Sequence, residues 1–153
     1  MNNLLFGNHE FGYYETICGG VGAGKGFDGA SAIHQHMTNT RITDPEIMEL
    51  NYPVRLNRFE VREDSGGSGK YNGGDGIRRE LEFTQPLTFT LLTQHRIIAP
   101  YGMEGGGPGK TGNQSLVRSN GNVEKLPGIC SGEVEIGDRL LIETPGGGGY
   151  GQE

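Results

Sequence analysis

The sequence predicts a mainly β domain: an antiparallel two-sheet sandwich or distorted barrel with glycine-rich loops and one short helix near 44–50. Short segments alternate apolar and polar residues, as half-buried strands do, and clusters of turn-forming residues separate them. Glycine accounts for 29 of 153 residues, well above the average usage of about 7%. These glycines show no Gly-X-Y period, so they indicate tight turns and not collagen.

Length and composition narrow the class of protein. A chain of 153 residues fits a single domain spanning 1–153. The net charge of −6 and the lack of a Lys/Arg cluster argue against nucleic-acid binding. The longest apolar runs fall far short of the ~20 residues that a membrane helix needs. No signal peptide opens the chain, so we expect a cytoplasmic protein in which Cys18 and Cys130 are reduced thiols.

The first predicted strand covers Tyr13 to Cys18, which is rich in aromatic and β-branched residues, whereas residues 1–12 show no periodicity. The glycine-rich stretch 19–26 follows. It nearly matches a phosphate-binding loop, but Gly26 stands where that motif needs Ser or Thr, and residues 27–30 are a weak start for a helix. A tight glycine turn, in which backbone approaches backbone or ligand, is the favoured interpretation.

Two histidines follow this loop. On a strand, His34 and His36 would point to one face and could chelate a metal, with Asp28 or Asp44 as a third ligand. No C-x-x-C or H-E-x-x-H pattern supports such a site. We therefore interpret them as ordinary hydrogen-bonded histidines and expect no metal.

The short helix is predicted from its start and stop signals. Asp44 is suited to the N-cap, Pro45 to the first helical position and Glu46 to the positive end of the helix dipole. The helix should end before Pro53, because a residue that precedes proline disfavours the helical conformation.

The remaining strands are predicted from alternation and turn residues. A bulge is expected near Phe59, where the alternation of 54–62 shifts. Segment 77–83 should pair with 87–98 as a hairpin across Thr84–Pro86, which would place His95 in a strand near a sheet edge. Shorter strands are expected at 114–118, 123–126 and 139–144, joined by turns at 120–121 and 136–138.

The chain ends near four consecutive glycines, Gly146 to Gly149. Ordering glycine costs more conformational entropy than ordering any other residue. This segment is therefore either flexible or held in place for a purpose.

Four blocks of sequence carry a resemblance to a known family. They are YYETICGGVGAGKGFDGASAIHQHMTNTRITDPEIMELNYPV, RFEVREDSGGSGKYNGGDGIRREL, PYGMEGGGPGKTG and TPGGGGYG. In this order they resemble the C-terminal part of the hydantoinase B/5-oxoprolinase family. The resemblance implies that the chain is a C-terminal fragment of a larger hydantoinase B-type region.

The resemblance also implies a function. A 5-oxoprolinase of this family converts 5-oxo-L-proline, ATP and water to L-glutamate, ADP and phosphate in glutathione metabolism, and the isolated chain should be inactive without the upstream regions. ATP and Mg²⁺ would be bound mainly outside this chain, by a hydantoinase A-like partner region or subunit. A homo-oligomer is also possible. The alternatives are a module of an N-methylhydantoinase-type cyclic amide hydrolase and a non-catalytic structural or interaction module.

No catalytic residue can be carried over from the family onto this chain. The substrate-binding candidates lie in the HMTNTR block, just before it and in the glycine loop: Gly22, Gly24, His34, His36, Asn39, Thr40 and Arg41. Arg41 could hold a carboxylate in bidentate fashion. The loops 19–26 and 146–149 could offer N–H donors to a developing negative charge.

Overall fold

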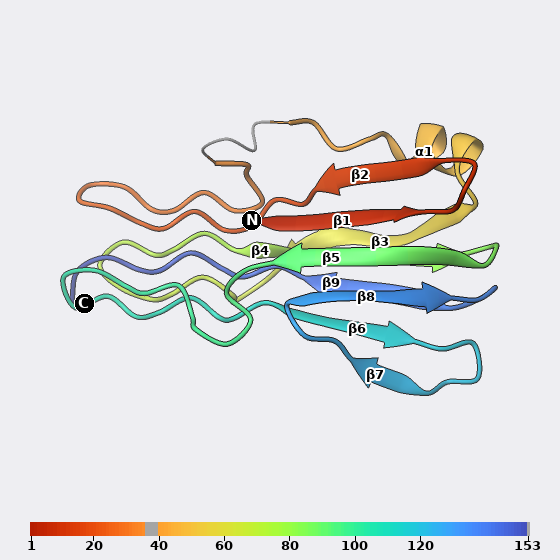
Figure 1. The fold of residues 1–153 in the computed structure, drawn as a ribbon. Coiled ribbons are helices and arrows are strands. Elements are labelled where there is room, and N and C mark those ends of the chain that lie inside the picture. The colour runs from red at the N-terminus through yellow and green to blue at the C-terminus, as the bar shows by residue number, and fades with distance from the viewer. Residues whose placement is uncertain (36–39, 153) are drawn as a thin grey trace.

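The computed structural model describes residues 1–35 and 40–152, which form two antiparallel sheets (Figure 1). The first sheet has the strand order β2-β1-β5-β8, and the second has the order β3-β4-β9-β6-β7. The elements are β1 (Asn2–Gly7), β2 (Gly12–Thr16), α1 (Pro45–Asn51), β3 (Val54–Arg62), β4 (Gly76–Phe83), β5 (Leu87–Thr93), β6 (Asn113–Val117), β7 (Val123–Lys125), β8 (Ile129–Val134) and β9 (Arg139–Glu143). The predicted sandwich is confirmed, and no ladder among the described residues closes it into a barrel.

Strand β1 was not predicted, yet it lies inside the first sheet between β2 and β5. Its core-facing side chains include Leu4 and Phe6, both almost fully buried. Asn2, Asn3 and Gly7 belong to residue types that are depleted in strands. Leu4 and Phe6 are the only two apolar residues of the inward face, and this alternation is too short to predict a strand among such neighbours.

The predicted hairpin between 77–83 and 87–98 is wrong. β4 pairs with β3 and β9 in the second sheet, whereas β5 pairs with β1 and β8 in the first. The turn at 84–86 therefore carries the chain from one sheet to the other. Alternation reports only that one face of a strand is buried, so it cannot identify the strand's partner. Because β5 ends at Thr93, His95 lies in the next loop, where its φ is 56°.

Several local predictions are confirmed. Asp44 caps α1 by accepting hydrogen bonds from the N–H groups of Glu46 (3.0 Å) and Ile47 (3.4 Å). The bulge in β3 lies between Leu56 and Arg58, slightly before its expected position. The strands β6, β7 and β9 and their turns also lie where they were predicted.

Strand β8 was not predicted. Its sequence, ICSGEV, places Gly132 opposite Phe89, where an added Cβ would come within 2.9 Å of the phenyl ring. A glycine at this inward position removes the apolar signal that would reveal the strand.

A buried ion pair links the two sheets. Arg79 on β4 donates from Nε to Glu15 Oε1 (2.7 Å) and from Nη2 to Glu15 Oε2 (3.0 Å). Tyr13 donates a further hydrogen bond to Glu15 Oε2 at 2.9 Å. Burial is the main reason that the pKa of Tyr13 rises to about 12, so its hydroxyl keeps the proton that it donates.

The glycine-rich segments 19–33, 63–76, 95–112 and 144–152 extend together from one end of the sandwich, at the left of Figure 1. Residues 144–149 are buried in their midst. Gly147 donates to the carbonyl oxygen of Gly74 and accepts from the N–H of Gly67, both at 2.8 Å. A Cβ on Gly147 would lie 2.0 Å from the carbonyl oxygen of Val21. The four glycines are therefore held in place, because only glycine permits such close packing of backbones.

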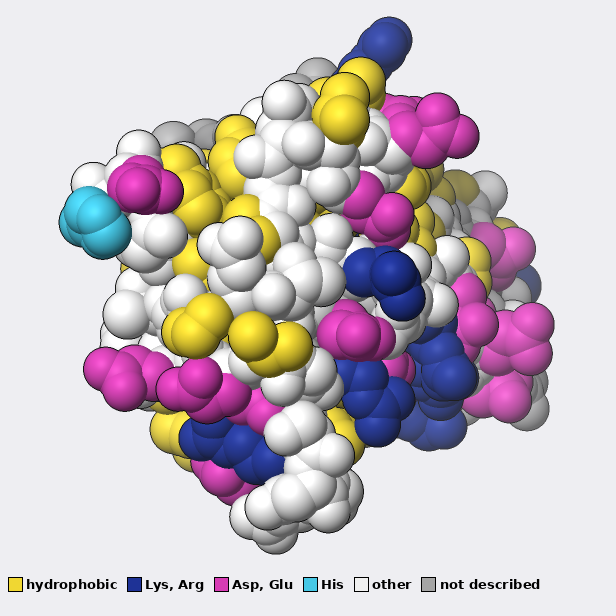
Figure 2. All heavy atoms as spheres, turned by 90° about the vertical axis from the view of Figure 1, so that its right-hand side faces the viewer, with side chains coloured by type: hydrophobic (Ala, Val, Ile, Leu, Met, Phe, Trp, Pro, Cys, Tyr) yellow, Lys and Arg dark blue, Asp and Glu magenta, His cyan; other side chains and the backbone are white. Residues whose placement is uncertain are grey.

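The opposite end of the molecule carries many charged side chains. Viewed from that end, Lys/Arg and Asp/Glu side chains lie next to one another, mainly on the right of Figure 2. Within the described ranges, no helix combines the length and apolar character that a membrane crossing requires.

Candidate functional site

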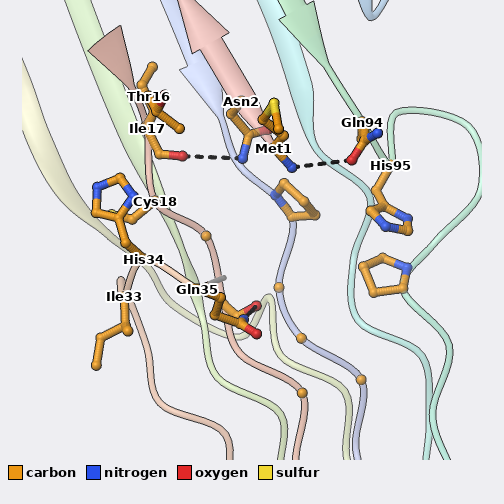
Figure 3. Close-up of a pocket in the computed structure, with 18 of the residues that line it drawn as sticks. Met1, Asn2, Thr16, Ile17, Cys18, Ile33, His34, Gln35, Gln94 and His95 are labelled. Carbon is orange, nitrogen blue, oxygen red and sulfur yellow. Dashed lines mark hydrogen bonds between the residues drawn. The ribbon is translucent and has the colours of Figure 1, made fainter. Parts of the chain in front are cut away.

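A cavity of about 540 Å³ opens where the first sheet meets the glycine segments. Its walls come from five separate parts of the chain: the start of β1, residues 16–22, residues 33–35, the loop after β5, and residues 145–148. In Figure 3, His34 and Cys18 lie on one side, Gln94 and His95 lie on the other, and Gln35 lies between them. Among the described residues, no Asp, Glu, Lys or Arg side chain lines the cavity.

His34 is the wall residue best suited to act on a ligand. Its Nδ1 is buried and has no hydrogen-bond partner among the described residues. Burial lowers the pKa of His34, so the imidazole is neutral at pH 7. A neutral imidazole offers one donor and one acceptor, and an unpaired buried nitrogen favours a ligand or water that pairs with it.

Cys18 contributes a thiol to the same wall but is not an activated nucleophile. The side chain is buried, and this burial raises the pKa of the thiol. Because the thiolate is the nucleophilic form, Cys18 is poorly reactive at neutral pH. It therefore shapes the cavity mainly through packing.

Arg96 places a positive charge behind the cavity wall. Its Nη1 donates to Oδ1 of Asn2, a wall residue, at 2.9 Å, and its Nε donates to Gln114 Oε1 at 3.1 Å. Burial, and then the nearby charge of Arg62, lower the pKa of Arg96 to about 10, so the guanidinium stays charged at pH 7. Its Nη2 is buried without a partner in the described part of the chain. This charge favours an anionic ligand in the cavity.

The glycine loop 19–26 does not have the geometry of a P-loop. The N–H groups of Gly20, Ala23 and Gly24 donate to the carbonyl oxygens of Pro145, Gly148 and Phe27, at distances of 2.8 to 3.2 Å. No helix follows the loop within 27–35. Its residues therefore do not fit ATP and Mg²⁺, and the tight-turn interpretation is confirmed by a positive φ of 91° at Gly26.

Most of the proposed N–H donors to a developing charge are likewise engaged. Gly146, Gly147 and Gly149 donate to backbone carbonyl oxygens of the neighbouring segments. Three wall glycines differ: the N–H groups of Gly19, Gly22 and Gly148 have no acceptor among the described residues. An anionic oxygen in the cavity would find its backbone donors among these three positions.

The predicted site residues divide into three groups. His34 and Gly22 line the cavity. Gly24 forms a tight bridge with Phe27 away from it, and Thr40 and Arg41 are exposed and do not line it. His36 and Asn39 lie outside the described residues. His34 and Gln35 have no regular structure.

Sequence reasoning missed Asn2, Cys18, Gln94 and His95 as wall residues. These residues are far apart in the sequence. Met1 and Gln94, for example, are hydrogen-bonded in the wall although 93 positions separate them. No local motif joins them, so only the strand order brings them together. Within the part of the chain that the structure describes, no group of three or more His, Cys, Asp or Glu residues is placed to hold a metal ion.

Comparisons with known proteins agree on one family. A family model described as hydantoinase B/oxoprolinase matches residues 1–153. The chain is 50% identical over 151 residues to 5-oxoprolinase 1 of Arabidopsis thaliana, covering 99% of this chain and 12% of that relative. It is 47% identical over 153 residues to the 5-oxoprolinase of Dictyostelium discoideum, covering 100% of this chain and 12% of that relative.

The fold also resembles a solved structure. The crystal structure of the ATP-dependent caprolactamase from Pseudomonas jessenii matches with a TM-score of 0.76 and 24% identity, over 98% of this chain and 28% of that one. At this level of identity the match supports the fold alone.

Proposed function

The chain belongs to the hydantoinase B/oxoprolinase family, and we propose that it is the C-terminal module of an ATP-dependent 5-oxoprolinase. The complete enzyme would convert 5-oxo-L-proline, ATP and water to L-glutamate, ADP and phosphate. The observation that carries this proposal is the identity of 50% and 47% to two proteins named 5-oxoprolinase, over nearly the whole chain. Because the chain spans 12% of each relative, the activity is proposed for the complete enzyme and not for this piece alone.

The chemistry explains why such an enzyme uses ATP. Opening a lactam requires the loss of amide resonance, and phosphorylation of the amide oxygen provides a better leaving group. We assign ATP and Mg²⁺ to a hydantoinase A-like region or subunit outside this chain. This assignment agrees with the glycine loop 19–26, where the N–H groups of Gly20, Ala23 and Gly24 already donate to backbone carbonyl oxygens.

In this proposal the cavity holds the anionic substrate or an intermediate derived from it. The Arg96 charge favours the carboxylate, and neutral His34 pairs with a polar group of the ligand. The N–H groups of Gly22 and Gly148 would stabilise a developing oxyanion. The cavity thus supplies binding and orientation to the complete active site.

We extend the proposal to the cellular role expected from the resemblance. The enzyme would act in the cytoplasm, in glutathione metabolism, with the upstream hydantoinase B and hydantoinase A-like regions as its partners. Homo-oligomer formation by the complete enzyme belongs to the same proposal.

A chimera tests the proposed substrate. In the chimera, this chain replaces the segment of the Arabidopsis relative that it matches, which is 12% of that protein's length. Glutamate release from 5-oxoproline is then measured with Mg-ATP. Hydantoin and N-methylhydantoin are assayed in parallel. We expect ATP-dependent glutamate release at a rate within about tenfold of the unmodified relative.

Two results would contradict the proposal. A folded chimera that hydrolyses only the hydantoins would support the N-methylhydantoinase alternative. A folded chimera with no turnover of any of these substrates would support a different function for this chain.

A further inference from the structure

The outward faces of the two sheets differ in charge. On the second sheet, ion pairs cross the outward face from strand to strand. Arg78 pairs with Glu143 at 2.7 Å, and Arg139 pairs with Glu80 at 2.9 Å. Such a face is suited to water, because solvated ion pairs cost little to keep exposed.

The outward face of the first sheet, here called the front face, carries almost no charge. It consists of Asn3, Leu5, Gly7, Gly12, Tyr14, Thr16, Thr88, Thr90, Leu92, Ile129, Ser131 and Glu133. Glu133, near the end of β8, is its single ionisable carboxylate. A sheet face without central charges is unusual for a surface that meets only water.

Large apolar side chains are exposed on this front face. The exposed fractions are 58% for Tyr14, 44% for Leu92 and 72% for Ile129. Leu92 lies directly opposite Ile129 in the sheet register, so the two form one apolar patch. The loop that follows β5 also exposes Ile97 and Ile98, by 92% and 78%. Contiguous exposed apolar surface of this kind marks an interaction site.

Several polar side chains of the front face are already hydrogen-bonded to one another. Thr90 Oγ1 and Ser131 Oγ share a hydrogen bond of 2.8 Å between neighbouring strands. Thr16 donates from Oγ1 to Asn3 Oδ1, and it also shares a hydrogen bond with the Tyr14 hydroxyl, both at 3.1 Å. Burial of these groups under a partner would leave few of them unsatisfied, so it would cost little free energy.

We propose that the front face is the docking surface for the remainder of the hydantoinase B region in the complete enzyme. This inference rests on the proposed function. The chain spans only 12% of its 5-oxoprolinase relatives and 28% of the caprolactamase chain, so most of each such protein lies outside the segment that this chain matches. That remaining part is the occupant, and it should meet the front face with an uncharged, partly apolar surface.

The test uses the Arabidopsis relative from which the matched segment has been deleted, with this chain added as a separate protein. Affinity is measured by calorimetry for the wild-type chain and for L92R and I129R, which place charges on the inner strand β5 and the edge strand β8 of the front face. V123R is the matched control, because Val123 on β7 of the second sheet is also exposed, at 62%. Circular dichroism melting checks that each variant is folded.

We expect L92R and I129R each to weaken binding at least tenfold, with V123R remaining within twofold of wild type. If wild type binds and both front-face variants bind equally well, the docking surface is wrong while the proposed function stands. If wild type does not bind at all, both proposals fail. A different outcome is that this chain forms dimers, that L92R abolishes them, and that the relative lacking its matched segment does not compete with them. The front face would then bind a second copy of this chain, and the inference would be overturned.

Discussion

At the scale of single residues, the ion pair of Glu15 and Arg79 is the most demanding feature of the core. Both side chains are almost fully buried, and the pair joins β2 in one sheet to β4 in the other. Arg79 also lies over the Phe59 ring at 5.2 Å and donates to Met48 Sδ at 3.5 Å, so α1 packs against the same group. Removal of one partner would leave a buried charge without compensation.

We therefore predict that Glu15→Gln lowers the free energy of unfolding by about 3–5 kcal/mol. Urea unfolding monitored by circular dichroism measures the change. Glu80→Gln is the control, since Glu80 pairs with the half-exposed Arg139, and the expected loss there is below about 1 kcal/mol. Equal losses in the two variants would show that the buried pair has no special role.

Asp138 should make stability depend on pH. Burial acts to raise the pKa of Asp138, but the N–H groups of Glu135 and Ser119 and the Arg118 guanidinium together lower it. The folded-state pKa therefore lies below the unfolded value, so the stabilisation is complete above the unfolded pKa and is lost as pH falls through the folded pKa.

Asp138→Asn should cost about 1–3 kcal/mol at pH 7, and the difference from wild type should shrink below about pH 4. Unfolding by urea at pH 7, 5, 4 and 3 measures it. A difference that stays constant over this range would contradict the assigned ionisation.

His34 connects the residue scale to the proposed activity. Burial lowers its pKa, so the neutral form dominates at pH 7 and protonation below about pH 6.5 should inhibit the complete enzyme. In the chimera, His34→Gln should lower kcat by about 10- to 100-fold and remove the acidic limb that this residue adds to the rate profile. His9→Gln is the control, because His9 lies on an exposed turn. If kcat and the dependence of rate on pH are both unchanged in His34→Gln, His34 does not take part in the site.

At the scale of elements, the glycine segments replace regular strands by close backbone packing. The central segment 144–149 is buried, and its neighbours include the loops that form the cavity wall. Substitutions there should act by overpacking, since an added methyl group meets a backbone carbonyl that cannot move aside.

Gly147→Ala should lower the free energy of unfolding by about 3 kcal/mol or more, because its Cβ would lie 2.0 Å from the Val21 carbonyl oxygen. Gly22→Ala is the matched control: its Cβ would meet no atom closer than 3.7 Å, and the expected change is within about 1 kcal/mol. Thermal melting of both variants measures the contrast. Tolerance of Gly147→Ala would contradict the close-packed arrangement.

Elements with strong local signals were predictable, and long-range arrangements were not. The helix after Asp44 and the buried face of β4 follow from residues a few positions apart. The partner of β4 does not, because the turn at 84–86 fits a hairpin and a crossover between sheets equally well. The cavity shows the same limit: His34 and Gly22 were identified from a local block, whereas Asn2 and Gln94 reach the wall only through the pairing of β1 with β5.

At the scale of the whole molecule, the sandwich has one face rich in ion pairs, one face with little charge and a cavity at the glycine-rich end. The chain spans 12% of its 5-oxoprolinase relatives. An outward face with little charge, and a cavity with no Asp, Glu, Lys or Arg in its described wall and Arg96 behind it, suit a module that docks within a larger enzyme and contributes part of a site for an anionic substrate.

The most direct test of this account is reconstitution of activity. The Arabidopsis relative without its matched segment, this chain alone and an equimolar mixture of the two are assayed for glutamate release from 5-oxoproline with Mg-ATP. The account predicts activity in the mixture and none above background in either component. Turnover by the chain alone, full turnover by the deleted relative alone, or an inactive mixture in which the two proteins bind each other would contradict it.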